Sequence, residues 1–142
     1  LIVADTGVHG STRAAVADVR ALLEREPERT GALLDRLGAI ARDAERALRV
    51  GGARATGGVM DESQRILREL GVSSTEIEAL VTAAKGAGAL GAKLSGGGQG
   101  GCIVALIGDG DDATAVTEAL RAAGATGIWS VPPAPHPSGT TR

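Results

Sequence analysis

Residues 93–106 read K-L-S-G-G-G-Q-G-G-C-I-V-A-L, a glycine-rich segment between two short runs of apolar residues. Of the six residues 96–101, five are glycines and only Gln99 interrupts them. The flanking runs, 91–95 and 102–107, are too short for capped helices, and the second is rich in β-branched residues, so we predict two strands joined by this loop. Because glycine adopts positive φ and has no side chain, such a loop lets a ligand approach its main-chain amides. Successive N–H groups that point inward form a concave site for an anion such as phosphate.

Two nucleotide-binding motifs come close to this segment, and neither fits it. Gly96, Gly98 and Gly101 satisfy the G-x-G-x-x-G spacing, but the dinucleotide-binding fingerprint needs a helix after its last glycine, where this sequence predicts a strand. The phosphate loop that ends in Gly-Lys-Ser or Gly-Lys-Thr is excluded as well, because Gly101 is followed by Cys102. A hairpin turn without a ligand remains an alternative, although six residues exceed the roughly two to five that hairpin loops favour.

The composition describes one globular domain with an aliphatic core. The chain has 142 residues, of which 43% are hydrophobic and 23% are charged, enough for a single core. Its formal net charge of −2 gives no reason to expect binding to nucleic acid or to an anionic membrane. Trp129 is the only aromatic residue, so the chain also lacks the stacking side chains of single-strand and RNA-binding proteins.

The single cysteine and the start of the sequence lead to expectations about the cellular compartment and about whether the chain is part of a longer protein. Cys102 is the only cysteine, which excludes a disulfide within the chain and favours a reducing compartment. We interpret it as a packing residue of an apolar strand rather than a nucleophile. No signal peptide and no apolar run of about 18 residues occurs, so a cytoplasmic protein is expected. The sequence opens directly on the apolar run 1–4 without a methionine, which suggests a fragment or a domain of a longer protein.

Hydrophobic periodicity and capping residues predict the other elements. We expect strands at 1–5 and 126–131 and helices at 12–25, from 28 or 30 to 49, at 54–70, from 73–75 to 86 and at 112–123. This order is that of a ferredoxin-like split βαβ fold whose first helical position is expanded into four helices. The predicted fold class is therefore α+β, with an antiparallel four-stranded sheet and helices on one face. The domain should span residues 1–131, and the proline-rich residues 132–142 should form a disordered tail.

The expected topology brings two segments together. In a ferredoxin-like sheet the first and third strands are neighbours in the middle, so the segment 5–12 and the loop 96–101 should lie at the same edge. The helix that begins near Thr12 would then point its N-terminus toward the glycine loop. Two amide-rich anion sites would face one pocket, which suits a phosphorylated ligand or a carboxylate.

Four motifs resemble a known family of enzymes. D-T-G-V-x-G-S-T-R at 5–13 and K-L-S-G-G-G-x-G-G-C at 93–102 resemble the C-terminal half of the mevalonate kinases, which belong to the GHMP small-molecule kinases. E-R-A-L at 45–48 and M-D-x-x-Q-x-x-L at 60–67 extend the resemblance, which covers residues 1–131. The loop departs from the family's commoner G-A-G-G-G-G by its three successive glycines followed by glutamine.

The resemblance implies a function and a set of site residues. The whole enzyme would use ATP and Mg²⁺ to transfer the γ-phosphoryl group of ATP to the 5-hydroxyl of mevalonate. The resemblance places substrate binding at Ser11 and Thr12 and phosphate binding at the glycine loop with its flanking serine, namely Ser95, Gly96, Gly97, Gly98, Gln99, Gly100 and Gly101. The family's main ATP-binding loop, of the type P-x-x-x-G-L-G-S-S-A, does not occur in this sequence, and its catalytic aspartate and lysine belong to the N-terminal domain. We therefore expect no catalytic residue and no metal ligand here, an inactive chain in isolation, and the N-terminal GHMP domain as its partner; a homodimer is left open.

Other interpretations stay open from the sequence. The chain fits another GHMP kinase, acting on phosphomevalonate or a sugar, and it also fits a ferredoxin-like module that binds an anionic metabolite without catalysis. A third interpretation is an assembly domain whose aliphatic helices form a dimer face. At single positions, Ser11 or Thr12 can be a plain helix cap, Ser95 a residue that ends a strand, and Lys93 a side chain that extends toward solvent.

Overall fold

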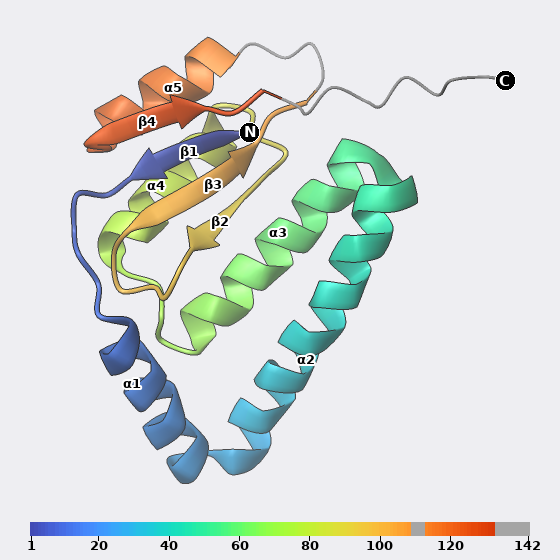
Figure 1. The fold of residues 1–142 in the computed structure, drawn as a ribbon, viewed down its shortest axis with the longest axis vertical. Helices are drawn as coiled ribbons and strands as arrows, with labels where there is room; N and C mark the ends of the chain where they lie inside the picture. Colours follow the sequence, from blue (N-terminus) through green and yellow to red (C-terminus); the bar gives the residue numbers. More distant parts are fainter. Residues whose placement is uncertain (109–112, 133–142) are drawn as a thin grey trace, which may run out of the picture.

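The computed structural model describes residues 1–108 and 113–132 and contains every element predicted there (Figure 1). In chain order these are β1 (Ile2–Asp5), α1 (Thr12–Arg25), α2 (Pro27–Arg46), the π-helical turn η1 (Ala47–Gly51), α3 (Gly52–Glu69), α4 (Thr75–Gly86), β2 (Gly91–Ser95), β3 (Cys102–Leu106), α5 (Ala113–Ala122) and β4 (Gly127–Ser130). The predicted boundaries differ from these by a few residues at most. The proposed tail lies outside the described residues, apart from Pro132.

The four strands of the described residues form one antiparallel sheet in the order β2-β3-β1-β4. β1 and β3 are the central pair, with Val3 opposite Val104, and β4 joins the far side of β1, where Trp129 lies opposite Val3. β2 forms the other edge, with Lys93 opposite Val104. This order confirms the predicted α+β fold with its ferredoxin-like sheet.

One face of the sheet packs against α4 and α5, as predicted. Alternate strand residues point into this layer and are almost completely buried, namely Ile2, Ala4, Ala92, Leu94, Ile103 and Ala105. The helices contribute Ile77, Leu80, Ala84, Val116 and Leu120. The core is entirely aliphatic, as the composition requires, and each of its fully buried Ile, Leu or Val side chains contributes about 1.5–3 kcal/mol.

Helix α3 lies along the β2 edge of the sheet rather than over a face. The outward N–H groups of β2 donate to its side chains: Ala92 N to Asp61 Oδ1 at 3.0 Å and Leu94 N to Gln64 Oε1 at 2.8 Å. Unpaired edge amides attract other strands, so this helix closes the edge. The approach needs a glycine, because a Cβ atom on Gly57 would lie 2.3 Å from the Leu90 carbonyl oxygen.

Helices α2 and α3 form an antiparallel hairpin in which α3 lies beside β2 and α2 lies on the far side of α3 (Figure 1). Regular α2 ends at Arg46, before the predicted end at 49, because the chain continues as the π-helical turn and reverses at Gly52, whose φ is +73°. Ile40, Ile66 and Leu70 form a small second core between the two helices.

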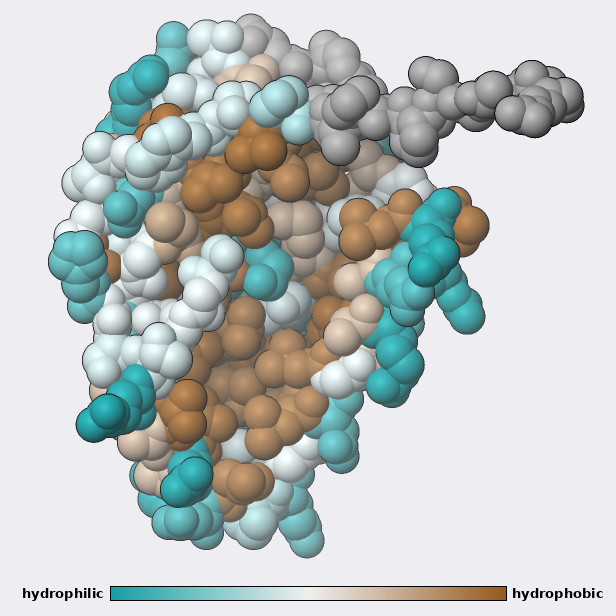
Figure 2. All heavy atoms as spheres, viewed as in Figure 1, coloured by the Kyte–Doolittle hydropathy of each residue, from teal (hydrophilic) through white to brown (hydrophobic). Residues whose placement is uncertain are grey.

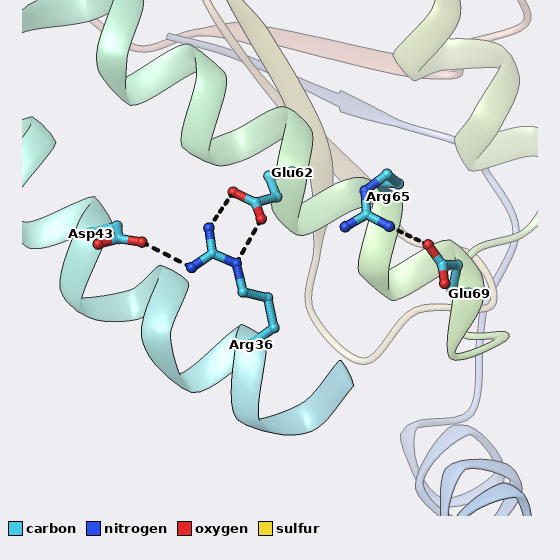
Figure 3. Close-up of polar contacts among 5 residues, drawn as sticks. All are labelled: Arg36, Asp43, Glu62, Arg65 and Glu69. Atoms are coloured by element: carbon cyan, nitrogen blue, oxygen red, sulfur yellow. Dashed lines mark hydrogen bonds and ion pairs between the residues drawn. The ribbon is translucent and has the colours of Figure 1, made fainter. Parts of the chain in front are cut away.

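Ion pairs join the outer sides of these two helices (Figure 3). The Arg36 guanidinium donates to both carboxylate oxygens of Glu62, at 2.7 and 2.8 Å, and its third nitrogen lies 3.4 Å from Asp43. Hydrogen bonding from Arg36 lowers the pKa of Glu62. Arg65 and Glu69 form a further pair within α3. Such exposed pairs contribute little to stability individually.

The face of the sheet opposite α4 and α5 is only partly covered within the described residues. Val3, Val104 and Trp129 belong to it, and Trp129 is 54% exposed. Figure 2 shows apolar side chains along the hollow between this face and α2. The part of the chain that the structure describes contains no helix long and apolar enough to cross a membrane.

Candidate functional site

The glycine loop between β2 and β3 has a backbone conformation that requires glycine. The φ angles of Gly96, Gly98, Gly100 and Gly101 are +95°, +83°, +130° and +81°. Gln99 adopts φ +57° and is the only residue other than glycine with a positive φ in the described part of the chain. Residues with a side chain rarely adopt a positive φ, so the backbone conformation of this loop explains why it consists almost entirely of glycine.

The segment after β1 holds the C-terminal end of the loop. The main-chain nitrogen and the hydroxyl of Thr6 both donate to the carbonyl oxygen of Gly101, at 2.9 and 2.8 Å. In return, Gly101 N donates to Val8 O at 2.7 Å. The structure therefore brings together the two segments that the topology placed at one edge of the sheet.

The tip of the loop is tied to two helical elements through Gln99. Its main-chain nitrogen donates to Val72 O at 2.7 Å, in the turn between α3 and α4. Its side-chain nitrogen donates to the Asp18 carboxylate of α1 at 2.8 Å. Sequence reasoning placed Gln99 in the phosphate-binding loop but did not predict either of these contacts.

Several glycines are required because the main chain of the loop packs directly against the main chain of the neighbouring segments. A Cβ atom on Gly10 would lie 2.2 Å from Gly98 O, and one on Gly98 would lie 2.2 Å from Val72 O. A Cβ atom on Gly100 would lie 2.4 Å from Val8 O. No side chain fits at these distances without movement of the backbone, so the loop is clamped between the β1–α1 segment and the α3–α4 turn.

Some amides of the loop are used within the protein and others are free. The N–H groups of Gln99 and Gly101 donate to Val72 and Val8, as described above. Those of Gly96, Gly97, Gly98 and Gly100 donate to no residue that the structure describes. Of these four residues Gly96 and Gly97 are exposed, whereas Gly98 and Gly100 are buried. The amides of Gly96 and Gly97 are therefore the ones most open to a ligand.

Ser11 and Thr12, the two hydroxyl residues at the start of α1, have different roles. Ser11 is the N-cap, and its hydroxyl accepts a hydrogen bond from Ala14 N at 3.2 Å. Thr12 is the first helical residue; its hydroxyl has no hydrogen-bond partner among the described residues. That hydroxyl faces the loop, since a Cβ atom on Gly97 would lie 2.3 Å from it. With no acidic residue in its first turn, α1 presents the positive end of its dipole here.

A pocket of 190 Å³ adjoins this contact. Thr12 and Gly97 form its polar side, and its remaining lining is apolar, from Ala15, Val16, Val19 and Val72. The site thus combines the exposed main chain of Gly97, the unpaired hydroxyl of Thr12 and a small apolar wall, which suits an anionic molecule with a short aliphatic part.

Three other residues considered from the sequence lie outside this arrangement. Ser95 is exposed at the end of β2, opposite Cys102. Burial, followed by the charge of Asp5, raises the pKa of the Cys102 thiol, which fits a packing role. Lys93 lies on the opposite side of β2 from the core and contributes no contact to the loop.

Sequence reasoning missed a polar network behind the loop. Gln64 is 2% exposed, and its amide donates to Ser73 Oγ at 3.0 Å and to Glu78 Oε1 at 2.8 Å while its oxygen holds Leu94 N. Burial alone would raise the pKa of Glu78, but hydrogen bonds from Arg68, Ser73 and Gln64 hold it below its ordinary value. The network fixes both β2 and the α3–α4 turn, the two elements that flank the loop. Its one signal was the M-D-x-x-Q motif, which we had used only as resemblance.

Helix α4 begins within the predicted range 73–75. Its N-cap is Ser74, whose hydroxyl accepts from Ile77 N at 3.3 Å, and Ser73 donates to Glu78 at 2.6 Å. Among the described residues there is no group of three or more His, Cys, Asp or Glu side chains placed to hold a metal ion.

Comparisons with known proteins agree with the predicted resemblance. A sequence model of the family described as "GHMP kinases C terminal" matches residues 44–126. The mevalonate kinase of Aeropyrum pernix is 42% identical over 111 residues, which are 78% of this chain and 34% of that protein. The mevalonate kinase of Pyrococcus furiosus is 35% identical over 131 residues, 89% of this chain and 39% of that protein.

Solved structures show the same relationship. The L. major mevalonate kinase in complex with R-mevalonate superposes with a TM-score of 0.84 and 35% identity, over 90% of this chain and 40% of that one. The Lactococcus lactis galactokinase complexed with galactose has a TM-score of 0.68 at 20% identity, over 90% of this chain and 43% of that one, which shows the fold alone. The chain spans only about two fifths or less of the curated relatives named above.

Proposed function

Because this chain belongs to the GHMP kinases and carries the C-terminal domain of that family, we propose that it forms the C-terminal part of an ATP-dependent mevalonate kinase. The whole enzyme transfers the γ-phosphoryl group of ATP to the 5-hydroxyl of mevalonate. Support for this substrate comes from the relatives named mevalonate kinase at 35–42% identity and from the fit to the L. major enzyme.

The clamped glycine loop is the observation that carries the proposal. The unpaired amides of its exposed residues Gly96 and Gly97, together with the N-terminus of α1, form a fixed positive surface, which stabilises the charge of a phosphoryl group without reorganisation. Phosphoryl transfer depends chiefly on such positioning and charge stabilisation. The hydrogen bonds through Thr6, Val8, Val72 and Gln99 keep this surface rigid.

The pocket beside Thr12 positions the substrate. The Thr12 hydroxyl donates to the carboxylate of mevalonate, or donates to or accepts from one of its hydroxyls, and Ser11 acts by capping the helix that carries Thr12. Val16 and Val19 provide an apolar wall for the aliphatic part of the molecule.

Binding of ATP and Mg²⁺ requires more of the enzyme than this chain. The free amides of the loop fit phosphate oxygens, whereas the family's main ATP-binding loop and its catalytic aspartate and lysine belong to the N-terminal domain. We therefore assign the binding of the nucleotide and Mg²⁺ to that domain acting together with the glycine loop. The 142-residue chain alone should not phosphorylate mevalonate.

A chimera tests the proposal. The matching C-terminal segment of the Aeropyrum pernix enzyme is replaced by this chain, and ATP-dependent phosphorylation is measured with mevalonate, phosphomevalonate and galactose. Preference for mevalonate supports the proposal, and preference for either other substrate assigns the chain to another GHMP kinase. A folded chimera that binds an anion but phosphorylates none of the three favours a binding module instead.

A further inference from the structure

A cavity of 220 Å³ lies between α2, α3 and β2 and shares no lining residue with the pocket at the glycine loop. Its wall is aliphatic and consists of Leu37, Ile40, Ala41, Ala44, Val59 and Met60. Two polar side chains, Ser63 of α3 and Lys93 of β2, complete the lining. An apolar wall with a small number of polar groups is typical of sites that bind small molecules. Figure 2 shows the apolar side chains along the hollow between the sheet and α2.

Lys93 is a half-buried cation without an opposite charge. Its ammonium donates to the main-chain oxygen of Leu94 at 2.6 Å, and no carboxylate of the described residues pairs with it. Lys85, the only other lysine of the chain, differs, because its ammonium lies 2.5 Å from Asp61 Oδ2. Burial lowers the pKa of Lys93, as happens when an ammonium loses water without gaining a counter-charge. Its two remaining N–H donors are available to an anion.

Ser63 is a second polar group without a partner in this cavity. It is 8% exposed, and its hydroxyl forms no hydrogen bond with the residues that the structure describes. A serine inside a helix often donates to the carbonyl four residues earlier, but that bond is absent here among the described contacts. No side-chain nitrogen or oxygen among the described residues is both fully buried and unpaired, so the Ser63 hydroxyl is open to the cavity and available to a ligand.

We propose that this cavity binds a short aliphatic carboxylate, with its charged group at Lys93 and Ser63 and its hydrocarbon chain against the aliphatic wall. A volume of 220 Å³ holds about seven water-sized groups at roughly 30 Å³ each, which sets the size of the ligand. A carboxylate accepts from both the ammonium and the hydroxyl, and such charge-assisted bonds are the stronger ones. This cavity shares no lining residue with the pocket assigned to the kinase substrate.

Pentanoate, with seven non-hydrogen atoms, is the probe. It is titrated into the 142-residue chain with labelled lysine, and the side-chain NMR signals are followed; the two lysines make assignment simple. The Lys93 signal should shift while the Lys85 signal stays, and pentanamide, which has the same shape without charge, should bind about tenfold more weakly or worse. Equal affinity for the two ligands, or no shift at Lys93, overturns the proposal.

Two variants give independent tests. Lys93→Met keeps the apolar stem, so it should abolish the preference for pentanoate over pentanamide, while the exposed Arg20→Met on α1 removes a charge elsewhere and should leave the preference intact. Ala44→Leu fills the cavity from α2 and should weaken both ligands together, which keeps the test decisive where Lys93→Met fails to fold. Unchanged pentanoate binding in folded Ala44→Leu, or an unchanged preference in folded Lys93→Met, contradicts the site.

Discussion

Replacing Gln64 by leucine should weaken the whole arrangement behind the glycine loop. The substitution keeps the side-chain size but leaves the buried N–H of Leu94 without its acceptor, which costs about 1–3 kcal/mol. It also removes one donor from Glu78, worth about 0.5–1.5 kcal/mol because Ser73 and Arg68 remain bound to that carboxylate. The free energy of unfolding should therefore fall by about 2–4 kcal/mol.

Urea unfolding of the 142-residue chain measures the total, and amide hydrogen exchange measures the local effect. Exchange of the Leu94 amide should be slow in the original chain and much faster in Gln64→Leu. Arg65→Gln on the exposed side of the same helix is the matched control and should change the unfolding free energy by less than about 0.5 kcal/mol. A loss below about 0.5 kcal/mol in Gln64→Leu, with Leu94 still protected, would refute the idea that α3 holds the β2 edge.

Three further predictions concern the site and its supports. Gly98→Ala places a methyl group against Val72 O at a positive φ and should cost about 2–4 kcal/mol in urea unfolding; a neutral effect would mean that the loop is not clamped. In the chimera, Thr12→Ala should lower kcat/KM for mevalonate by about tenfold or more while Thr12→Ser retains most of it, and equal loss in both would point to packing. Since the pKa of Glu78 is lowered below its ordinary 4.5, its stabilisation is present above that value and is lost as pH falls through the folded pKa. The stability difference between the original chain and Glu78→Gln should therefore shrink in acid, and a constant difference would contradict the assigned hydrogen bonds.

Local patterns predicted the elements because helices and strands of this chain have clear periods and caps. Residues 12–25 form a helix with the predicted bounds, and Ser11 is one of the two caps that local chemistry allowed. The strand order in the sheet could be predicted from the order of helices and strands along the chain, because few sheet topologies are compatible with that order.

Contacts between distant segments were not predictable in the same way. The local sequence gives no sign that Gly57 admits the main chain of β2 beside α3. Asp61 and Gln64 were noted only as part of the M-D-x-x-Q-x-x-L motif, which did not predict that both would accept hydrogen bonds from the edge strand. The hydrogen bonds of Gln99 to Val72 and Asp18 were likewise not predictable, because both partners lie far from it in sequence. Hydrophobic periodicity predicts which face of a helix or strand is buried, but it does not predict which hydrogen-bond partners the polar residues of that element will have.

The most direct measurement of the central claim is a titration of the chain with inorganic phosphate, followed through its main-chain amide NMR signals. The amides of the exposed Gly96 and Gly97 should shift together with that of Thr12, whereas the internally bonded amides of Gln99 and Gly101 should shift little. Shifts confined to other parts of the chain, or none at phosphate concentrations that saturate weak anion sites, would contradict the claim that the loop and the start of α1 form one anion site.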